Sequence, residues 1–168
     1  MVKITPLSDA DPSAVEALLD DAFGADRRGR TAYRMREGTQ AIDALCFGAF
    51  DGGRLVGTIQ CWPVSLLTPL GAQPMVMVGP VAVEPDRQRD GIGRALVAAS
   101  LAASDARGGD VLMMIGDPEY YGRFFGFSAD GTALWEVPGP VERHRLLARV
   151  PDGTVMAAAG RIAPRVHA

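Results

Sequence analysis

The stretch VAVEPDRQRDGIGRAL, Val81–Leu96, changes character abruptly and decides how the rest of the chain is interpreted. Its apolar beginning has the composition of a core strand, and the residues from Ile92 onward have helical spacing. The loop between them carries three arginines around two glycines, Gly91 and Gly93. A simple turn needs no such concentration of positive charge, whereas an anion bound by the loop would explain it.

This loop combines features that bind phosphate. A helix N-terminus presents free backbone N–H groups and the positive end of the helix dipole. Glycines at positions 91 and 93 let a phosphate approach the backbone closely. The side chains of Arg87, Arg89 and Arg94 can pair with further phosphate oxygens. The pattern predicts a pyrophosphate or polyphosphate site, and a tight turn with exposed arginines is the alternative, because a short glycine pattern is a weak signal.

Two well-known phosphate loops do not match this sequence. A P-loop requires GxxxxGK[ST], and Lys3 is the only lysine in the chain. A dinucleotide-binding fold requires GxGxxG, but here Gly91-Ile92-Gly93 is followed by Arg94-Ala95-Leu96, so the third glycine is absent. Another kind of phosphate site is therefore needed.

Composition sets the limits of the interpretation. A chain of 168 residues with 48% hydrophobic residues suits one soluble globular domain over residues 1–168. Its net charge of −3 argues against nucleic acid as the main partner. No run of about eighteen apolar residues predicts a membrane span, and no secretory signal is evident. We expect a cytoplasmic protein without a membrane partner, in which Cys46 and Cys61 are reduced and buried.

Local patterns predict alternating strands and helices without a repeat or a linker. A helix is expected from Asp11, which can cap it, with Pro12 at the first position. A hairpin is expected around Asp51-Gly52-Gly53. The other elements are strands at 1–8, 72–85, 110–116 and 144–150, and helices at 91–109 and 118–127.

The central strand at 72–85 contains Gly79-Pro80. Proline cannot donate to a sheet ladder, so an interior strand should be disrupted there. A bulge would bend the strand and leave backbone groups unpaired for a ligand. The pattern is equally compatible with a strand that ends early at this point.

The form [QR]xxGx[GA], present here as Gln88–Gly93, resembles the GNAT superfamily of acetyltransferases, and closely the small bacterial YhbS-like group. The resemblance extends from the first strand to about Val150. Its strongest parts are VGPVAVEPDRQRDGIGRALV and VLMMIGDPEYYGRFFGF, which stand in the family's order and spacing. It implies an α/β (α+β) fold with a single GNAT-like domain. The expected sheet is central, mixed, mostly antiparallel and splayed at the middle, with helices on both faces, which favours the bulge at Gly79-Pro80.

The resemblance also implies the ligand and the reaction. Acetyl-coenzyme A is the expected acetyl donor and coenzyme A the product, with no metal. The acceptor is expected to be a primary amine of a small molecule or peptide that attacks directly in a ternary complex, and a homodimer is compatible with this fold. Backbone groups of Val81, Ala82 and Val83 are expected to pair with the pantetheine arm. The expected amide donors to the pyrophosphate are Gln88, Arg89, Asp90, Gly91, Ile92, Gly93 and Arg94.

A tyrosine can serve as the acid that protonates the departing thiolate. Family members often place one five residues before the phenylalanine of a Gly-Phe pair, but five residues before Phe127 stands Gly122. Tyr121 lies one residue further back and is the favoured acid, with Tyr120 as the alternative. Both tyrosines are also compatible with simple packing of the helix. Asp117, near the place where many relatives have asparagine, is explained by helix capping.

Other charged residues give no general base. Glu84 is expected to be solvated, Glu119 and Asp43 are candidates only as carboxylates, and His144 is expected at the surface. The displaced tyrosine and the missing base leave a second function open, a non-catalytic acyl-coenzyme A-binding or regulatory module on the same fold. The segment 25–44 and the tail are expected to select the acceptor, where Arg34 or Arg36 could hold a carboxylate. The cluster Arg27, Arg28, Arg30, Arg34 and Arg36 is otherwise expected to be solvated.

Overall fold

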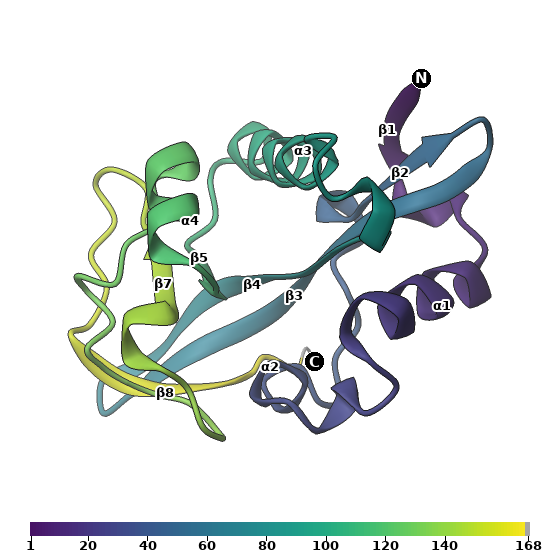
Figure 1. The fold of residues 1–168 in the computed structure, drawn as a ribbon. Coiled ribbons are helices and arrows are strands. Elements are labelled where there is room, and N and C mark those ends of the chain that lie inside the picture. The colour runs from purple at the N-terminus through teal and green to yellow at the C-terminus, as the bar shows by residue number, and fades with distance from the viewer. Residues whose placement is uncertain (167–168) are drawn as a thin grey trace. The chain divides into compact units, whose positions relative to one another are not determined.

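A computed structural model describes residues 1–166, and Figure 1 shows its helices and strands as a ribbon. The strands are β1 (Val2–Pro6), β2 (Phe47–Asp51), β3 (Arg54–Thr68), β4 (Gly71–Val83), β5 (Leu112–Ile115), β6 (Leu134–Glu136), β7 (Leu146–Arg149) and β8 (Ala159–Pro164). The α-helices are α1 (Pro12–Phe23), α2 (Thr31–Arg34), α3 (Ile92–Ala106) and α4 (Pro118–Phe125).

The strands form a mixed open sheet in the order β1-β2-β3-β4-β5-β7, with β8 paired to β3 and to β6. The β1–β2, β2–β3, β3–β8 and β5–β7 pairs are antiparallel, whereas β4–β5 and β6–β8 are parallel. A mixed, mostly antiparallel sheet flanked by helices confirms the predicted fold class.

The chain divides into two compact units. The first unit comprises Met1–Arg28, Ala41–Cys61 and Val78–Gly108, and the second comprises Gly29–Gln40, Trp62–Met77 and the chain from Gly109 onward. The long strands β3 and β4 contribute residues to both. The expectation of one domain over residues 1–168 stays a prediction.

In the first unit, helices lie on opposite faces of the strands, α1 on one side and α3 on the other (Figure 1). The Asp11 side chain caps α1 by accepting a hydrogen bond from the Ser13 N–H at 3.0 Å, as predicted. The buried stripe of Val15, Leu18 and Leu19 packs against Ala82 of β4. On the other face, Gly57 allows close approach of α3, because a Cβ there would lie 2.9 Å from the Ile92 side chain.

Arg27, in the first unit, corrects the expectation of a solvated arginine cluster. Its side chain is only 1% exposed. The guanidinium donates to Glu16 at 2.8 Å and to Asp20 at 3.0 Å, two carboxylates on α1. Burial is tolerated because charge-assisted hydrogen bonds replace the lost hydration. The residue therefore fastens the turn after α1 to the helix.

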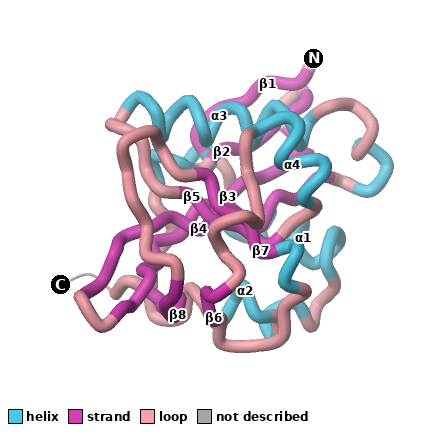
Figure 2. Tube along the Cα trace, turned by 90° about the vertical axis from the view of Figure 1, so that its left-hand side faces the viewer, coloured by secondary structure: helices cyan, strands magenta, loops and turns pink. Residues whose placement is uncertain are grey.

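The second unit has its core around Trp135, which is 1% exposed and donates its indole N–H to the Ala157 carbonyl at 3.0 Å. The predicted strand at 144–150 is confirmed as β7, which pairs with β5 through Met113 and Ala148. After α4 the expected strand is the one at 144–150, and the structure adds β6 and β8, which run side by side (Figure 2).

The Gly79-Pro80 step does not end its strand. β4 runs from Gly71 to Val83 without interruption, so the interpretation of an early end is wrong. The peptide bond is cis and Gly79 has a φ of 128°. The parallel pairs between β4 and β5 are formed by Val76 and Met77, before this step.

Other expectations concern single residues and the membrane. Cys46 and Cys61 are free and buried, as predicted. His144 is at the surface, also as predicted, and lies 3.6 Å from the Glu142 carboxylate. No helix within residues 1–166 is long and apolar enough to cross a membrane.

Candidate functional site

The N-terminus of α3, in the first unit, carries backbone donors without partners inside the helix. Gly91 is the N-cap, in the left-handed conformation with a φ of 76°, and no side chain caps the helix. The first intrahelical bond runs from the Ala95 N–H to the Gly91 carbonyl at 3.1 Å. The amides of Ile92 and Gly93 precede that bond, and the first turn of any helix leaves such N–H groups without an intrahelical acceptor. Two predicted donors are thus adjacent at the positive end of the dipole.

The two glycines at this helix start are little crowded by the rest of residues 1–166. A Cβ built on Gly91 would meet no atom within 4 Å, and one on Gly93 would meet only the Val83 side chain at 3.8 Å. A left-handed glycine followed by exposed N–H groups fits an anion better than a side-chain cap would. The geometry therefore fits a phosphate group, and any larger residue at position 91 would fill the cradle.

The loop before the helix is held by its own hydrogen bonds. The Asp90 N–H donates to the Arg87 carbonyl at 3.2 Å, so this predicted amide donor is already engaged. The Gln88 side chain donates to the Val83 carbonyl at 3.4 Å, which joins the loop to the end of β4. Arg89 is exposed. The structure thus brings the predicted strand residues and the predicted loop residues together in one unit.

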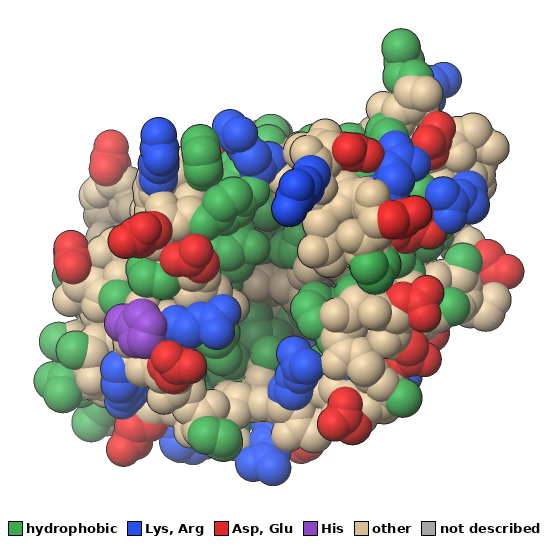
Figure 3. All heavy atoms as spheres, in the orientation of Figure 1, with side chains coloured by type: hydrophobic (Ala, Val, Ile, Leu, Met, Phe, Trp, Pro, Cys, Tyr) green, Lys and Arg blue, Asp and Glu red, His purple; other side chains and the backbone are tan. Residues whose placement is uncertain are grey.

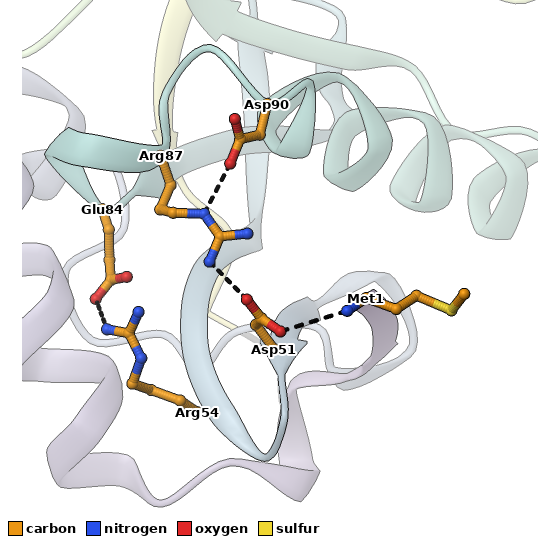
Figure 4. A network of polar contacts seen from close by, with 6 residues as sticks. All are labelled: Met1, Asp51, Arg54, Glu84, Arg87 and Asp90. Atoms are coloured by element: carbon orange, nitrogen blue, oxygen red, sulfur yellow. Dashed lines mark hydrogen bonds and ion pairs between the residues drawn. The ribbon is translucent and has the colours of Figure 1, made fainter.

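Arg87 is bound by carboxylates, which corrects its expected role as a phosphate partner. Its guanidinium donates to Asp51 at 2.7 Å and to Asp90 at 2.7 Å (Figure 4). The hydrogen bond from Arg87 holds the pKa of Asp51 below its ordinary value, and the same contacts, first with Asp90 and then with Asp51, raise the pKa of Arg87. The guanidinium therefore stays charged and paired.

A second ion pair lies beside this one. Glu84, at the end of β4, accepts a hydrogen bond from Arg54 at 2.5 Å, so the expectation that Glu84 is solvated is wrong. Figure 3 shows acidic and basic side chains intermixed over this part of the surface, at the upper right of the view. Sequence reasoning missed both Asp51 and Arg54. They lie far from the loop in the sequence, and their only local signal is that of a hairpin turn.

The predicted tyrosines lie on α4, in the second unit. Asp117 caps this helix by accepting from the Glu119 N–H at 3.0 Å, and Gly126 ends it with a φ of 77°. The rings of Tyr120 and Tyr121 meet edge to face, with centroids 4.9 Å apart at 84°. Such a pair gives the helix a rigid aromatic face.

The phenol of Tyr121 keeps its proton at neutral pH. Burial is the largest cause of its raised pKa, nearby Tyr120 and Asp117 add to it, and Arg145 opposes it. The ring lies against Gly116, where a Cβ would come within 2.8 Å of it. A buried, protonated phenol can donate a proton, and the same packing also explains the residue structurally.

A cavity of about 530 Å³ lies in the second unit beside the end of α4. Its lining includes Gly126, Asp130, Leu134, Trp135 and Met156, and is mostly apolar. All of these residues follow α4 in the sequence, where the tail was expected to contribute to acceptor choice. No pattern in the sequence predicts this cavity.

Comparisons with known proteins agree with this geometry. The family described as "Acetyltransferase (GNAT) domain" matches residues 3–129. An "Uncharacterized N-acetyltransferase" of Streptomyces avermitilis is 33% identical over 102 residues, 59% of this chain. The match covers 24% of that protein, so the chain spans about a quarter of the curated relative's length.

Solved structures show the same fold. The GNAT family N-acetyltransferase YhbS of Escherichia coli, in complex with CoA, is 23% identical with a TM-score of 0.74, over 98% of this chain and 89% of that one. A GNAT family acetyltransferase of Brucella melitensis, in complex with acetyl-CoA, is 24% identical with a TM-score of 0.67, over 98% and 96%. Because the family match covers more than half of the sequence, this chain belongs to the GNAT acetyltransferase family.

Proposed function

We propose that this protein is an N-acetyltransferase that moves an acetyl group from acetyl-coenzyme A to a primary amine by direct attack in a ternary complex. The observation that carries the proposal is the N-terminus of α3, where left-handed Gly91 is the N-cap and no side chain caps the helix. The loop before this helix also carries exposed Arg89, whose positive charge is suited to a bound pyrophosphate. The coenzyme A complexes of the two similar structures support the same ligand.

The proposed ligand contacts come from two neighbouring segments. The amides of Ile92, Gly93 and Arg94 would hold the pyrophosphate, and Arg89 would add a charged contact from the loop. Hydrogen bonds to charged groups contribute about 1.5–3 kcal/mol each, so these contacts would supply a substantial part of the about 8 kcal/mol that micromolar affinity requires. The backbone of Val81–Val83 would receive the pantetheine arm as an added strand.

The proposed chemistry assigns one proton transfer to the chain. Acetyl-coenzyme A, when bound, supplies an acetyl thioester that an amine can attack. The Tyr121 hydroxyl would give its proton to the departing thiolate, and its raised pKa keeps that proton available at neutral pH. Tyr120 is the second candidate for this role, because it is the neighbouring phenol on the same helix.

The acceptor, in this proposal, is an amine of a small molecule or a peptide. The protein would work in the cytoplasm as a single domain over residues 1–168, without a nucleic acid or membrane partner, and a homodimer is compatible with the fold. The alternative function is a non-catalytic acyl-coenzyme A-binding or regulatory module. The packing of Tyr121 against Gly116 favours that alternative to the extent that it gives the tyrosine a structural role.

One experiment separates the two functions. The full-length protein is titrated with acetyl-coenzyme A by calorimetry and then assayed for thiol release with a panel of small and peptide amines. The enzyme proposal predicts micromolar binding and turnover with at least one amine, with turnover lost in Tyr121→Phe. Binding without turnover for any amine in the panel would favour the module, and absence of binding would contradict both.

A further inference from the structure

Side-chain ion pairs join the tip of the β2–β3 hairpin to the segment before α3, beside a backbone hydrogen bond from the Glu84 N–H to the Val56 carbonyl at 3.0 Å. Asp51 and Arg54 stand on either side of the Gly52-Gly53 turn, and each forms an ion pair with the segment that follows β4. Figure 4 shows the two contacts side by side, Asp51 with Arg87 and Arg54 with Glu84. All of these residues belong to the first unit. The hairpin therefore supports the loop at two points.

The Arg87 contacts shape the turn that precedes Gly91. The Arg87 side chain binds Asp90 at 2.7 Å, and the Asp90 N–H in turn donates to the Arg87 carbonyl at 3.2 Å. Side chain and backbone thus close the same short turn, and Asp90 is the residue directly before the N-cap. Asp51 holds the other nitrogen of the guanidinium at 2.7 Å and anchors the turn to β2.

The charges of this cluster are unfavourable for an anion site when taken alone. Asp51 and Asp90 place two carboxylates beside a loop that would bind a pyrophosphate, and like charges repel. Arg87 is occupied by these carboxylates, so it would lose two strong contacts by turning to a phosphate. These carboxylates reduce the electrostatic attraction of the loop for a pyrophosphate. Any favourable effect of the cluster on binding must therefore come from the geometry that it gives the loop.

We propose that Asp51 and Arg87 are positioning residues for coenzyme A, which hold the turn that aims the α3 amides at the pyrophosphate. The inference rests on the proposed function, since it assumes that coenzyme A is the anion. It adds a role for Asp51, a residue on another strand that touches no part of the ligand in this scheme. Preorganised donors bind more tightly because no entropy is lost in ordering them on binding.

Asp51→Asn distinguishes positioning from charge by the sign of its effect. Removing a negative charge near an anion site should tighten binding if charge alone matters. If Asp51 positions the loop, the variant should bind coenzyme A at least fivefold more weakly, because the amide side chain cannot hold Arg87 as a carboxylate does. Pantetheine, which lacks the pyrophosphate, should bind to the variant with an unchanged dissociation constant. A general structural defect would weaken the binding of both ligands.

Two further variants sharpen the comparison. Asp86→Asn is the matched control, because Asp86 is an exposed aspartate of the same loop without an ion pair to any residue in 1–166. It should not weaken coenzyme A binding. Arg87→Lys keeps the charge but cannot bind two carboxylates in a planar fork, so it should weaken coenzyme A binding as Asp51→Asn does.

The measurement is calorimetric titration of the full-length protein with coenzyme A and with pantetheine, after thermal melting shows that each variant is folded. Weaker coenzyme A binding in Asp51→Asn and Arg87→Lys, with Asp86→Asn like the wild type, supports the inference. If Asp51→Asn fails to fold, Arg87→Lys decides. Unchanged or tighter binding in the folded variants overturns it. Failure of the wild type to bind coenzyme A would instead overturn the proposed function itself, and the inference with it.

Discussion

The ring of Tyr121 lies so close to the backbone of Gly116 that a methyl group on Gly116 would approach its edge to 2.8 Å. Gly116 follows β5, and Tyr121 lies in the middle of α4. Glycine at this position therefore lets the edge of the ring approach the chain closely between the strand and the helix. The orientation of the Tyr121 ring, the candidate acid, therefore depends on the absence of a side chain at Gly116.

The first prediction changes that contact. Gly116→Ala should displace the Tyr121 ring, lower turnover at least tenfold and destabilise the protein by about 1–3 kcal/mol, the usual cost of overpacking. The dissociation constant of acetyl-coenzyme A should change less than twofold. Gly131→Ala is the control, because a Cβ there meets no atom within 4 Å, and both activity and melting temperature should stay the same. Wild-type turnover in a folded Gly116→Ala variant would contradict this account.

The second prediction concerns the Tyr121 hydroxyl. Tyr121→Phe should lower kcat about 100-fold and leave acetyl-coenzyme A binding intact, as expected for loss of an acid. An acid acts in its protonated form, and the pKa of Tyr121 is raised above its ordinary value of 10. The wild-type rate should therefore stay high up to pH 10 and fall only above it. The residual rate of Tyr121→Phe should show no such fall. If Tyr120→Phe has the larger effect, the acid is Tyr120.

The third prediction is a pH dependence of stability that originates at Cys46. Burial raises the pKa of this thiol from 9.0 to about 11. A group whose pKa is raised by folding contributes fully below its unfolded value, and the contribution is lost as the pH rises through the folded value. The shift corresponds to about 2–3 kcal/mol, lost between about pH 9 and pH 11. Denaturant unfolding from pH 8 to 11 should show a larger loss in the wild type than in Cys46→Ala, where only the raised pKa of Tyr121 still contributes above pH 10, and parallel curves for the two would refute it.

The fourth prediction tests the buried arginine. Arg27→Met removes both contacts to α1 and should lower the free energy of unfolding by about 2–3 kcal/mol. This is at or below the low end for a broken buried ion pair, because Glu16 and Asp20 are nearly half exposed and can be hydrated. Arg28→Met is matched to it. Arg28 also binds Glu16 but is 61% exposed, so its loss should cost less than 1 kcal/mol. Equal effects in chemical denaturation would show that burial does not distinguish the two arginines.

Local signals accounted for the elements that surround the candidate site. The capped start of α1, the hairpin at Gly52-Gly53 and the start of α3 at Gly91 each depend on residues next to one another in the chain. Their physical causes are capping, positive φ and side-chain periodicity, which act over one turn. Because these causes act between residues that are close in the chain, they are visible as local sequence patterns, and these elements were predicted correctly.

Long-range pairing left no such pattern. Asp51, the partner of Arg87, is 36 residues away in the sequence, and the burial of Arg27 depends on two carboxylates 7 and 11 residues before it. The expectation that Glu84 is solvated failed because its partner Arg54 belongs to another strand, 30 residues away in the sequence. A charged residue is identical in sequence whether it is paired or hydrated. Only the fold distinguishes the arginine that braces the loop from those that face solvent.

The most direct test of the central claim is a calorimetric titration with acetyl-coenzyme A of the wild type, Gly91→Glu and Gly153→Glu. Gly91 and Gly153 have φ values of 76° and 83°, and a Cβ on either meets no atom within 4 Å, so both variants carry the same backbone strain and the same new charge. Because only position 91 lies in front of the α3 amides, we predict micromolar binding to the wild type and to Gly153→Glu, and none to a folded Gly91→Glu. Wild-type affinity in Gly91→Glu would show that the loop before α3 is not the coenzyme A site.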